Sequence, residues 1–181
     1  MSAAEGPLVV GVDSSTQSTK ALVVDASTGR VVASGQASHT VSSGAGRESD
    51  PRQWWDALCE ALHQCGDAAR EAAAVSIGGQ QHGLVTLDAQ GEPVRPALLW
   101  NDVRSAPQAA RLIEELGGPK AWAERTGSVP GPSFTVTKWA WLAEHEPEAL
   151  RATKAVRLPH DYLTDRLTGC LLYTSDAADE L

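Results

Sequence analysis

Residues 8–25 read LVVGVDSSTQSTKALVVD, which is two short apolar runs joined by a loop of small hydroxyl residues. Leu8–Asp13 and Lys20–Asp25 each have the length and the Val-rich composition of a buried β-strand. A third extended stretch, Arg30–His39, follows a turn cluster at Ala26–Gly29. The three stretches together predict a meander of three strands.

A helix is predicted to begin directly after Asp50, because Asp is a favoured N-cap and Pro51 suits the first helical position. Its apolar residues recur at three-to-four spacing and predict a buried stripe: Trp54, Leu58, Ala61, Leu62 and Cys65. On this helix Cys59 and Cys65 are interpreted as small apolar packing residues.

The rest of the chain continues to alternate between strand and helix patterns. Strands are expected at residues 72–77, 84–87, 96–100 and 156–158, and helices at 109–116, 119–125, 135–145 and 159–167. Residues 72–77 are expected to form a buried strand. This order of elements predicts an α/β fold with a mixed sheet and flanking helices.

Composition narrows the class of protein further. The chain has 181 residues, 42% of them apolar, which suits one globular domain or one and a fraction. A formal charge of -8 argues against a nucleic-acid or anionic-membrane surface, which needs a basic face. Three cysteines without a CxxC pair, and no signal-peptide or membrane-spanning pattern, lead us to expect a cytoplasmic protein.

The loop Asp13–Lys20, DSSTQSTK, is the first polar cluster that follows a predicted strand. Small hydroxyl residues let backbone N–H groups approach an anion, and the Asp13 carboxylate could hold Mg²⁺. The alternative is a plain hairpin turn, which the loop taken alone favours. It contains neither GxxxxGK[ST] nor GxGxxG, so no P-loop or dinucleotide fingerprint is indicated.

Two further clusters carry groups that suit a polyol. Gly78–Gly83, GGQQHG, places hydrogen-bonding side chains between glycines, although His82 taken alone is more often a turn or core histidine. Trp100–Arg104, WNDVR, offers an aromatic platform followed by polar groups. Its alternative is a helix-entry loop with a weak surface pair between Asp102 and Arg104.

These clusters occur in an order that resembles the FGGY family of carbohydrate kinases over Leu8–Gly169. The resemblance rests on five segments in order: GVDSSTQSTKALVVD, AAAVSIGGQQHG, ALLWNDVR, SFTVTKWAWLAEH and LPHDYLTDRLTG. It is strongest to the bacterial members that phosphorylate D-xylulose. A kinase acting on another pentulose or polyol, and a non-catalytic sugar-binding module, remain alternatives.

The resemblance implies an actin/Hsp70/hexokinase-like, ribonuclease H-like α/β fold. It implies transfer of the γ-phosphoryl group of ATP, with Mg²⁺, to D-xylulose. Asp13 is implied near the transferring phosphate and its metal, as the catalytic and metal residue. The residues implied to line the nucleotide phosphates are Thr16, Gln17, Ser18 and Lys20. Those implied near the sugar are Gln81, His82, Trp100 and Asp102.

The sequence departs from the family pattern at a few positions. Gln81 stands where methionine is common and His160 where lysine is common. The family's general base and most of its adenosine pocket belong to a second domain, so residues 1–169 are expected to be an incomplete, inactive first domain. Residues 170–181, CLLYTSDAADEL, are expected to be a non-native tail. The full-length enzyme is expected to bind a sugar and ATP but neither nucleic acid nor membrane, and a homodimer is compatible with the resemblance.

Overall fold

A computed structural model describes residues 6–42 and 46–170, and they fold into two compact units. The first unit contains the residues up to Thr40, Pro51–Gln80 and those from His160 onward. The second contains Val41–Asp50 and Gln81–Pro159. The last eleven positions of the expected tail, 171–181, lie outside the described residues. Each unit contains both β-sheet and helices.

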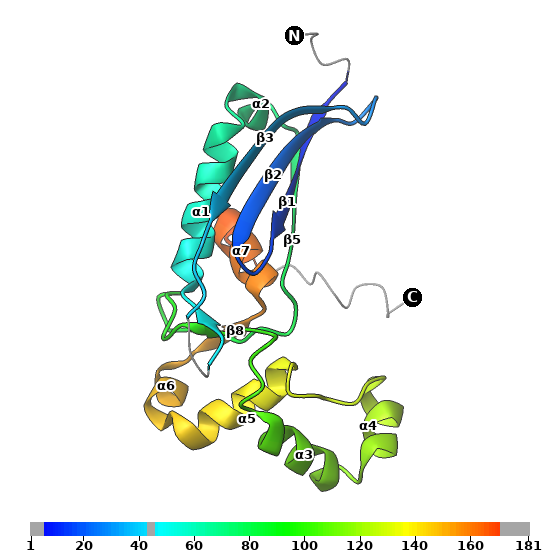
Figure 1. Ribbon diagram of the computed structural model, residues 1–181, viewed down its shortest axis with the longest axis vertical. Helices are drawn as coiled ribbons and strands as arrows, with labels where there is room; N and C mark the ends of the chain where they lie inside the picture. Colours follow the sequence, from blue (N-terminus) through cyan, green and yellow to red (C-terminus); the bar gives the residue numbers. More distant parts are fainter. Residues whose placement is uncertain (1–5, 43–45, 171–181) are drawn as a thin grey trace. The chain divides into compact units, whose positions relative to one another are not determined.

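The first unit is built on a four-stranded sheet in the order β3-β2-β1-β5 (Figure 1). Its strands are β1 (Leu8–Ser14), β2 (Ser18–Asp25), β3 (Val31–Ser38) and β5 (Ala74–Gly79). β1 pairs with β2 and β2 with β3 in antiparallel register, whereas β5 pairs with β1 in parallel register. The predicted three-stranded meander and mixed sheet are therefore confirmed.

Helices α1 (Pro51–Gln64), α2 (Asp67–Arg70) and α7 (Pro159–Thr168) complete this unit, and Figure 1 shows α1 running along the sheet. α1 begins at the predicted proline and buries Trp54, Leu58 and Ala61 as the periodicity predicted. Trp54 meets Tyr162 of α7 edge-on, with 6.4 Å between ring centroids. These aromatic and aliphatic side chains form the core under the strands, where buried apolar area is the main stabilising term.

Two predictions about burial in this unit are wrong. β5 is not a buried strand, because among the described strands it pairs with β1 alone at the edge of the sheet, and Val75 is 44% exposed. Cys65 is buried as expected, but Cys59 is exposed. Cys59 lies within α1 on a face that is open to solvent, whereas Cys65 follows the last residue of the helix and is buried.

The described residues of the second unit form two small antiparallel sheets and four helices. One sheet pairs β4 (Glu48–Ser49) with β7 (Ala97–Leu98), and the other pairs β6 (Val85–Leu87) with β8 (Ala155–Arg157). The helices are α3 (Ala106–Glu115), α4 (Pro119–Thr126), α5 (Thr135–His145) and α6 (Pro147–Ala152). α5 has the predicted bounds, whereas α6 and the two-residue β4 were not predicted.

The core of the second unit is a cluster of three buried leucines, Leu84, Leu98 and Leu142. Leu84 and Leu98 also bridge their backbones, with N–H···O distances of 2.8 and 3.2 Å. The segment after Gln81 is therefore fixed to the segment that carries Trp100. Within residues 6–42 and 46–170, no helix combines the length and the apolar character needed to cross a bilayer.

Candidate functional site

The loop Asp13–Lys20 is a tight hairpin between β1 and β2 in the first unit. The Ser15 backbone N–H and Oγ both donate to the Ser18 carbonyl, at 3.0 and 3.1 Å. Thr16 and Gln17 occupy the tip of the turn, and the Gln17 carbonyl accepts from the His39 N–H at 2.9 Å. The predicted hairpin turn is therefore confirmed. Gln17, at the tip of the turn, is exposed.

Asp13 and Lys20 lie directly opposite each other across the β1–β2 pair, so both side chains project from the same face of the sheet. Both are exposed and line an open groove of about 310 Å³. Gly11, Ser76 and Gly78 contribute to the same groove and carry little or no side chain. The arrangement gives one carboxylate and one ammonium group open access to a ligand.

The base of the hairpin is held by buried polar contacts. Ser14 Oγ lies 3.0 Å from Thr19 Oγ1, and both residues are buried. The Gln80 backbone N–H donates to the Ser14 carbonyl and its side-chain amide donates to the Ser15 carbonyl, both at 3.3 Å. Gln80 therefore fixes the end of β1, a role that the sequence did not single out.

The predicted sugar-binding residues all lie in the second unit. Gln81 is exposed and His82 is half-buried. His82 has φ 61°, the one non-glycine residue in the described ranges with a left-handed backbone. Such a conformation costs on the order of 1 kcal/mol and persists only where the surroundings impose it. The His82 imidazole stacks on Phe134, with ring centroids 4.5 Å apart and planes at 17°.

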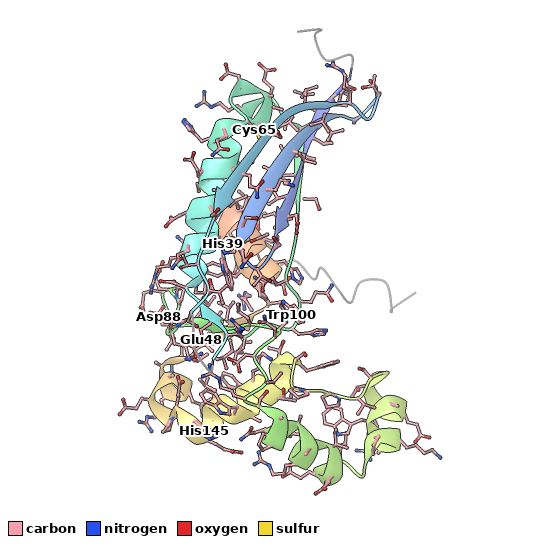
Figure 2. All side chains as sticks on the ribbon, in the orientation of Figure 1. His39, Glu48, Cys65, Asp88, Trp100 and His145 are labelled. Atoms are coloured by element: carbon pink, nitrogen blue, oxygen red, sulfur yellow. The ribbon has the colours of Figure 1, made fainter. Side chains whose placement is uncertain are left out.

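Trp100 follows β7 and remains 46% exposed, as an aromatic platform for a ligand would require (Figure 2). Two residues later the chain turns inward, with the Asp102 N–H donating to the Leu99 carbonyl at 3.0 Å. Asp102 itself is buried. The alternative interpretation of this segment, a pair between Asp102 and Arg104, is borne out as a pairing, but it is not a surface pair, because the carboxylate is withdrawn from solvent.

Both oxygens of Asp102 are occupied by donors. Oδ1 accepts from the Arg104 N–H and Nε, each at 3.0 Å, and Oδ2 accepts from the Arg47 N–H at 2.8 Å. Arg104 Nη2 adds an ion pair to Oδ2 at 2.7 Å. Burial acts to raise the pKa of Asp102, but these hydrogen bonds outweigh it and hold the pKa below its usual value. A ligand hydroxyl could reach this carboxylate only by exchanging with one of these donors.

Lys138 of α5 is fully buried and anchors the loops that surround Asp102. Its ammonium group donates to the carbonyls of Asp102 at 3.1 Å, Pro132 at 2.7 Å and Ser133 at 3.0 Å. Each of the three N–H groups of the ammonium therefore has a carbonyl acceptor. Burial lowers the pKa of Lys138 to about 8, against the opposing effect of the Asp102 carboxylate.

This lowered pKa predicts a pH dependence of stability. Between about pH 8 and 10.5 the unfolded chain holds a proton on Lys138 that the folded chain has lost, so the free energy of unfolding rises with pH. The slope is at most about 1.4 kcal/mol per pH unit, the value for one proton. Urea unfolding of the wild type and of Lys138→Met across this range measures the difference. Parallel pH profiles for the two proteins would contradict the assignment.

Backbone and side-chain contacts link the three segments of the second unit that carry or support the sugar-site candidates. Thr135 Oγ1 donates to the Gly83 carbonyl at 3.4 Å, Leu84 bridges to Leu98, and Lys138 holds the Asp102 carbonyl. The sequence did not reveal that two residues of the segment Ser133–His145 support the others. Phe134 contacts His82, and Lys138 binds the carbonyl of Asp102. A lysine and an aromatic residue at the start of an apolar helix were the signal available.

No cluster of three or more His, Cys, Asp or Glu side chains that could hold a metal occurs in the described part of the chain. Asp13 offers a single carboxylate without a hydrogen-bond or ion-pair partner among those residues. One carboxylate combined with substrate phosphates is a common way to hold Mg²⁺. The donor set at Asp13 therefore fits a metal that arrives with a nucleotide.

Comparison with known proteins agrees with this architecture. The description "FGGY family of carbohydrate kinases, N-terminal domain" matches residues 8–179. A xylulose kinase from Streptomyces coelicolor is 89% identical over 169 residues, which is 93% of this chain and 35% of that protein. A xylulose kinase from Escherichia coli is 38% identical over 176 residues, which is 95% of this chain and 35% of that protein.

Solved structures give the same result. The crystal structure of xylulose kinase from Bifidobacterium adolescentis matches with a TM-score of 0.83 and 46% identity, covering 91% of this chain and 34% of that one. The xylulose kinase from Rhodospirillum rubrum matches with a TM-score of 0.84 and 30% identity, covering 91% and 35%. These likenesses confirm the expected actin/hexokinase-like α/β fold. The chain spans about a third of the length of these relatives, and it belongs to the FGGY family of carbohydrate kinases, whose N-terminal domain it contains.

Proposed function

We propose that this chain is the sugar-binding N-terminal part of a kinase that transfers the γ-phosphoryl group of ATP to D-xylulose and forms D-xylulose 5-phosphate. The observation that carries the proposal is the 89% identity over 169 residues to a protein described as xylulose kinase. The accessible side chains of Gln81 and His82 in the second unit support the proposal. They can supply the hydrogen-bond partners that sugar hydroxyl groups need when they are buried in a complex.

In this proposal the second unit binds the sugar. Gln81 and His82 supply side chains that can both donate and accept hydrogen bonds, as hydroxyl groups require. Trp100 provides an exposed ring for the apolar face of the sugar. Asp102 acts mainly by fixing the loop after Trp100, because four donors already occupy its oxygens.

The first unit binds the phosphates of ATP in the same proposal. The turn of the hairpin, formed by Thr16, Gln17 and Ser18, would contact the phosphates. The ammonium group of Lys20 lines the groove opposite Asp13. Asp13 would hold Mg²⁺, which when bound neutralises charge on the phosphate oxygens. Phosphoryl transfer depends mainly on positioning and charge stabilisation, which open loops on a rigid sheet can provide. The general base and most of the adenosine pocket are not among the residues assigned here.

The expectation that residues 170–181 are foreign stays a proposal. The alignment of 169 residues to the Streptomyces relative supports it, whereas the family match up to residue 179 counts against it. Resequencing across the codon for Gly169 decides the question, and an unbroken native frame reading CLLYTSDAADEL would overturn it. A cytoplasmic location, where ATP is available, and a homodimer of the full-length enzyme also remain proposals.

The substitution His82→Ala tests the proposed sugar site. The host is a chimera that joins residues 1–169 of this chain to the remaining part of the Streptomyces coelicolor relative, which is 89% identical to this chain over 169 residues. Loss of the hydrogen bonds that His82 is proposed to make to the bound sugar predicts a KM for D-xylulose raised about 10-fold or more, with the KM for ATP changed less than about 2-fold. Steady-state kinetics with each substrate varied in turn measures both constants.

The exposed histidine His145 provides a matched control, because its ring stacks on Trp141 and its Nδ1 lies 2.9 Å from the Trp141 carbonyl. His145→Ala is expected to leave both KM values unchanged. Equal increases in the two KM values for His82→Ala would remove this histidine from the sugar site.

A further inference from the structure

The stacked rings of His82 and Phe134 connect the candidate sugar segment to the residue that precedes α5. The two rings are nearly parallel, at 17°, with centroids 4.5 Å apart. An imidazole donates and accepts hydrogen bonds at the edge of its ring, so a partner on its face leaves the edges open. Within the described residues, neither nitrogen of His82 has a hydrogen-bond partner.

Phe134 is held rigidly by its own backbone. It precedes α5 in an extended conformation, with φ -70° and ψ 143°, and its carbonyl accepts from the Thr137 hydroxyl at 2.8 Å and from the Lys138 N–H at 3.3 Å. Its N–H donates to the Gly131 carbonyl at 3.0 Å. The buried ammonium group of Lys138 holds the carbonyls of the two preceding residues. The Phe134 ring is therefore presented from a segment with few remaining freedoms.

The other half of the pair is fixed as well. The left-handed backbone of His82 is followed by Gly83, whose carbonyl accepts from Thr135 Oγ1 at 3.4 Å. A Cβ placed on Gly83 would lie 2.6 Å from Pro159 Cγ, so the chain passes this point in close contact with its neighbour. Both rings thus project from anchored backbone, and the stack fixes the remaining rotation of the imidazole.

We propose that Phe134 is a positioning residue for sugar recognition, because it holds the His82 imidazole flat and directs its ring nitrogens at the sugar. The proposal rests on the function proposed above for the second unit. It assigns Phe134 no contact with substrate. Removing the aromatic ring of Phe134 should weaken sugar binding by about 3-fold to 10-fold, the fold-change that corresponds to the stabilisation of one aromatic pair.

The first experiment needs no activity and uses the 181-residue chain. NMR spectra report the ring protons of His82, assigned by comparison with His82→Ala, and a stacked phenyl ring shifts them upfield. Phe134→Leu, which keeps apolar volume but removes the aromatic face, is expected to move them downfield. Phe134→Tyr is expected to preserve the shift. His145, stacked on Trp141 at 4.8 Å, is the internal control and should not respond.

The second experiment measures kinetics in the chimera. Phe134→Leu is expected to raise the KM for D-xylulose about 3-fold to 10-fold and to leave the KM for ATP unchanged. Phe134→Tyr should restore the wild-type value. In the His82→Ala background, Phe134→Leu should have no further effect, since the residue it positions is absent.

The outcomes separate the two proposals. His82 shifts that ignore Phe134→Leu, or additive effects of the two substitutions on KM, overturn the positioning role. A chimera inactive on D-xylulose, in which the His82 shifts nevertheless respond to Phe134→Leu, overturns the proposed function and supports the fixed imidazole. An ATP KM raised as much as the sugar KM identifies a merely structural residue and also overturns the inference.

Discussion

Gly35→Ala is expected to lower the free energy of unfolding by about 3 kcal/mol or more, the upper range for overpacking a core. Gly35 lies in β3 where the strand crosses α1, and a Cβ there would lie 2.0 Å from the Ala61 carbonyl oxygen. That oxygen belongs to helix backbone and cannot rotate away as a side chain could. The strand and the helix would have to separate, which would open the contact that buries the core of the first unit.

Gly11→Ala is the matched control in the same sheet. Gly11 lies in β1, and a Cβ there meets no atom within 4 Å. Alanine in place of a strand glycine is expected to be neutral or slightly stabilising. Urea unfolding of both variants and the wild type, followed by far-ultraviolet circular dichroism, measures the difference. Equal midpoints for the two variants would mean that β3 and α1 do not approach as closely as described.

Asp13→Asn is expected to lower kcat in the chimera by at least about 100-fold, the scale for losing one group that stabilises transition-state charge. Asparagine keeps the shape of the side chain but removes its charge, and a neutral amide is a weaker Mg²⁺ ligand than a carboxylate. The fold should be retained, because Asp13 is exposed and lines an open groove. Rapid-quench or coupled assays at saturating D-xylulose measure kcat, with the Mg²⁺ concentration varied.

Asp56→Asn is the control for charge alone, since Asp56 is an exposed carboxylate on α1. It is expected to keep wild-type kcat and the wild-type Mg²⁺ requirement. If Asp13→Asn retained full turnover with a normal Mg²⁺ requirement, Asp13 would not belong to the phosphate and metal site.

Local sequence signals were enough to predict the elements that carry strong periodicity or capping. The two short Val-rich runs on either side of the polar loop predicted β1 and β2, and Asp50-Pro51 predicted the start of α1. α5, whose apolar residues recur regularly from Thr135 to His145, was predicted with its observed bounds. The two-residue strand β4 has no such signal, because its pairing with β7 depends on contacts between distant segments.

Burial was harder to predict than secondary structure. Residues 72–77 have the composition of a buried strand, yet β5 is an exposed edge, since composition does not say how many neighbours a strand has. Lys138 reads as a surface residue by type but is fully buried, because three carbonyls converge on it from two loops. The left-handed backbone of His82 and its stack on Phe134 arise from tertiary packing and leave no local pattern.

In the proposed function, the loops around His82 and Trp100 belong to a D-xylulose kinase. The most direct measurement compares kcat/KM for D-xylulose, other pentuloses and glycerol in the chimera that carries residues 1–169 of this chain. We expect ATP-dependent phosphorylation with D-xylulose at least about 10-fold more efficient than any other substrate, because each mismatched hydroxyl leaves a polar group unpaired. A folded chimera that prefers glycerol or another pentulose, or phosphorylates none of them, would contradict the claim.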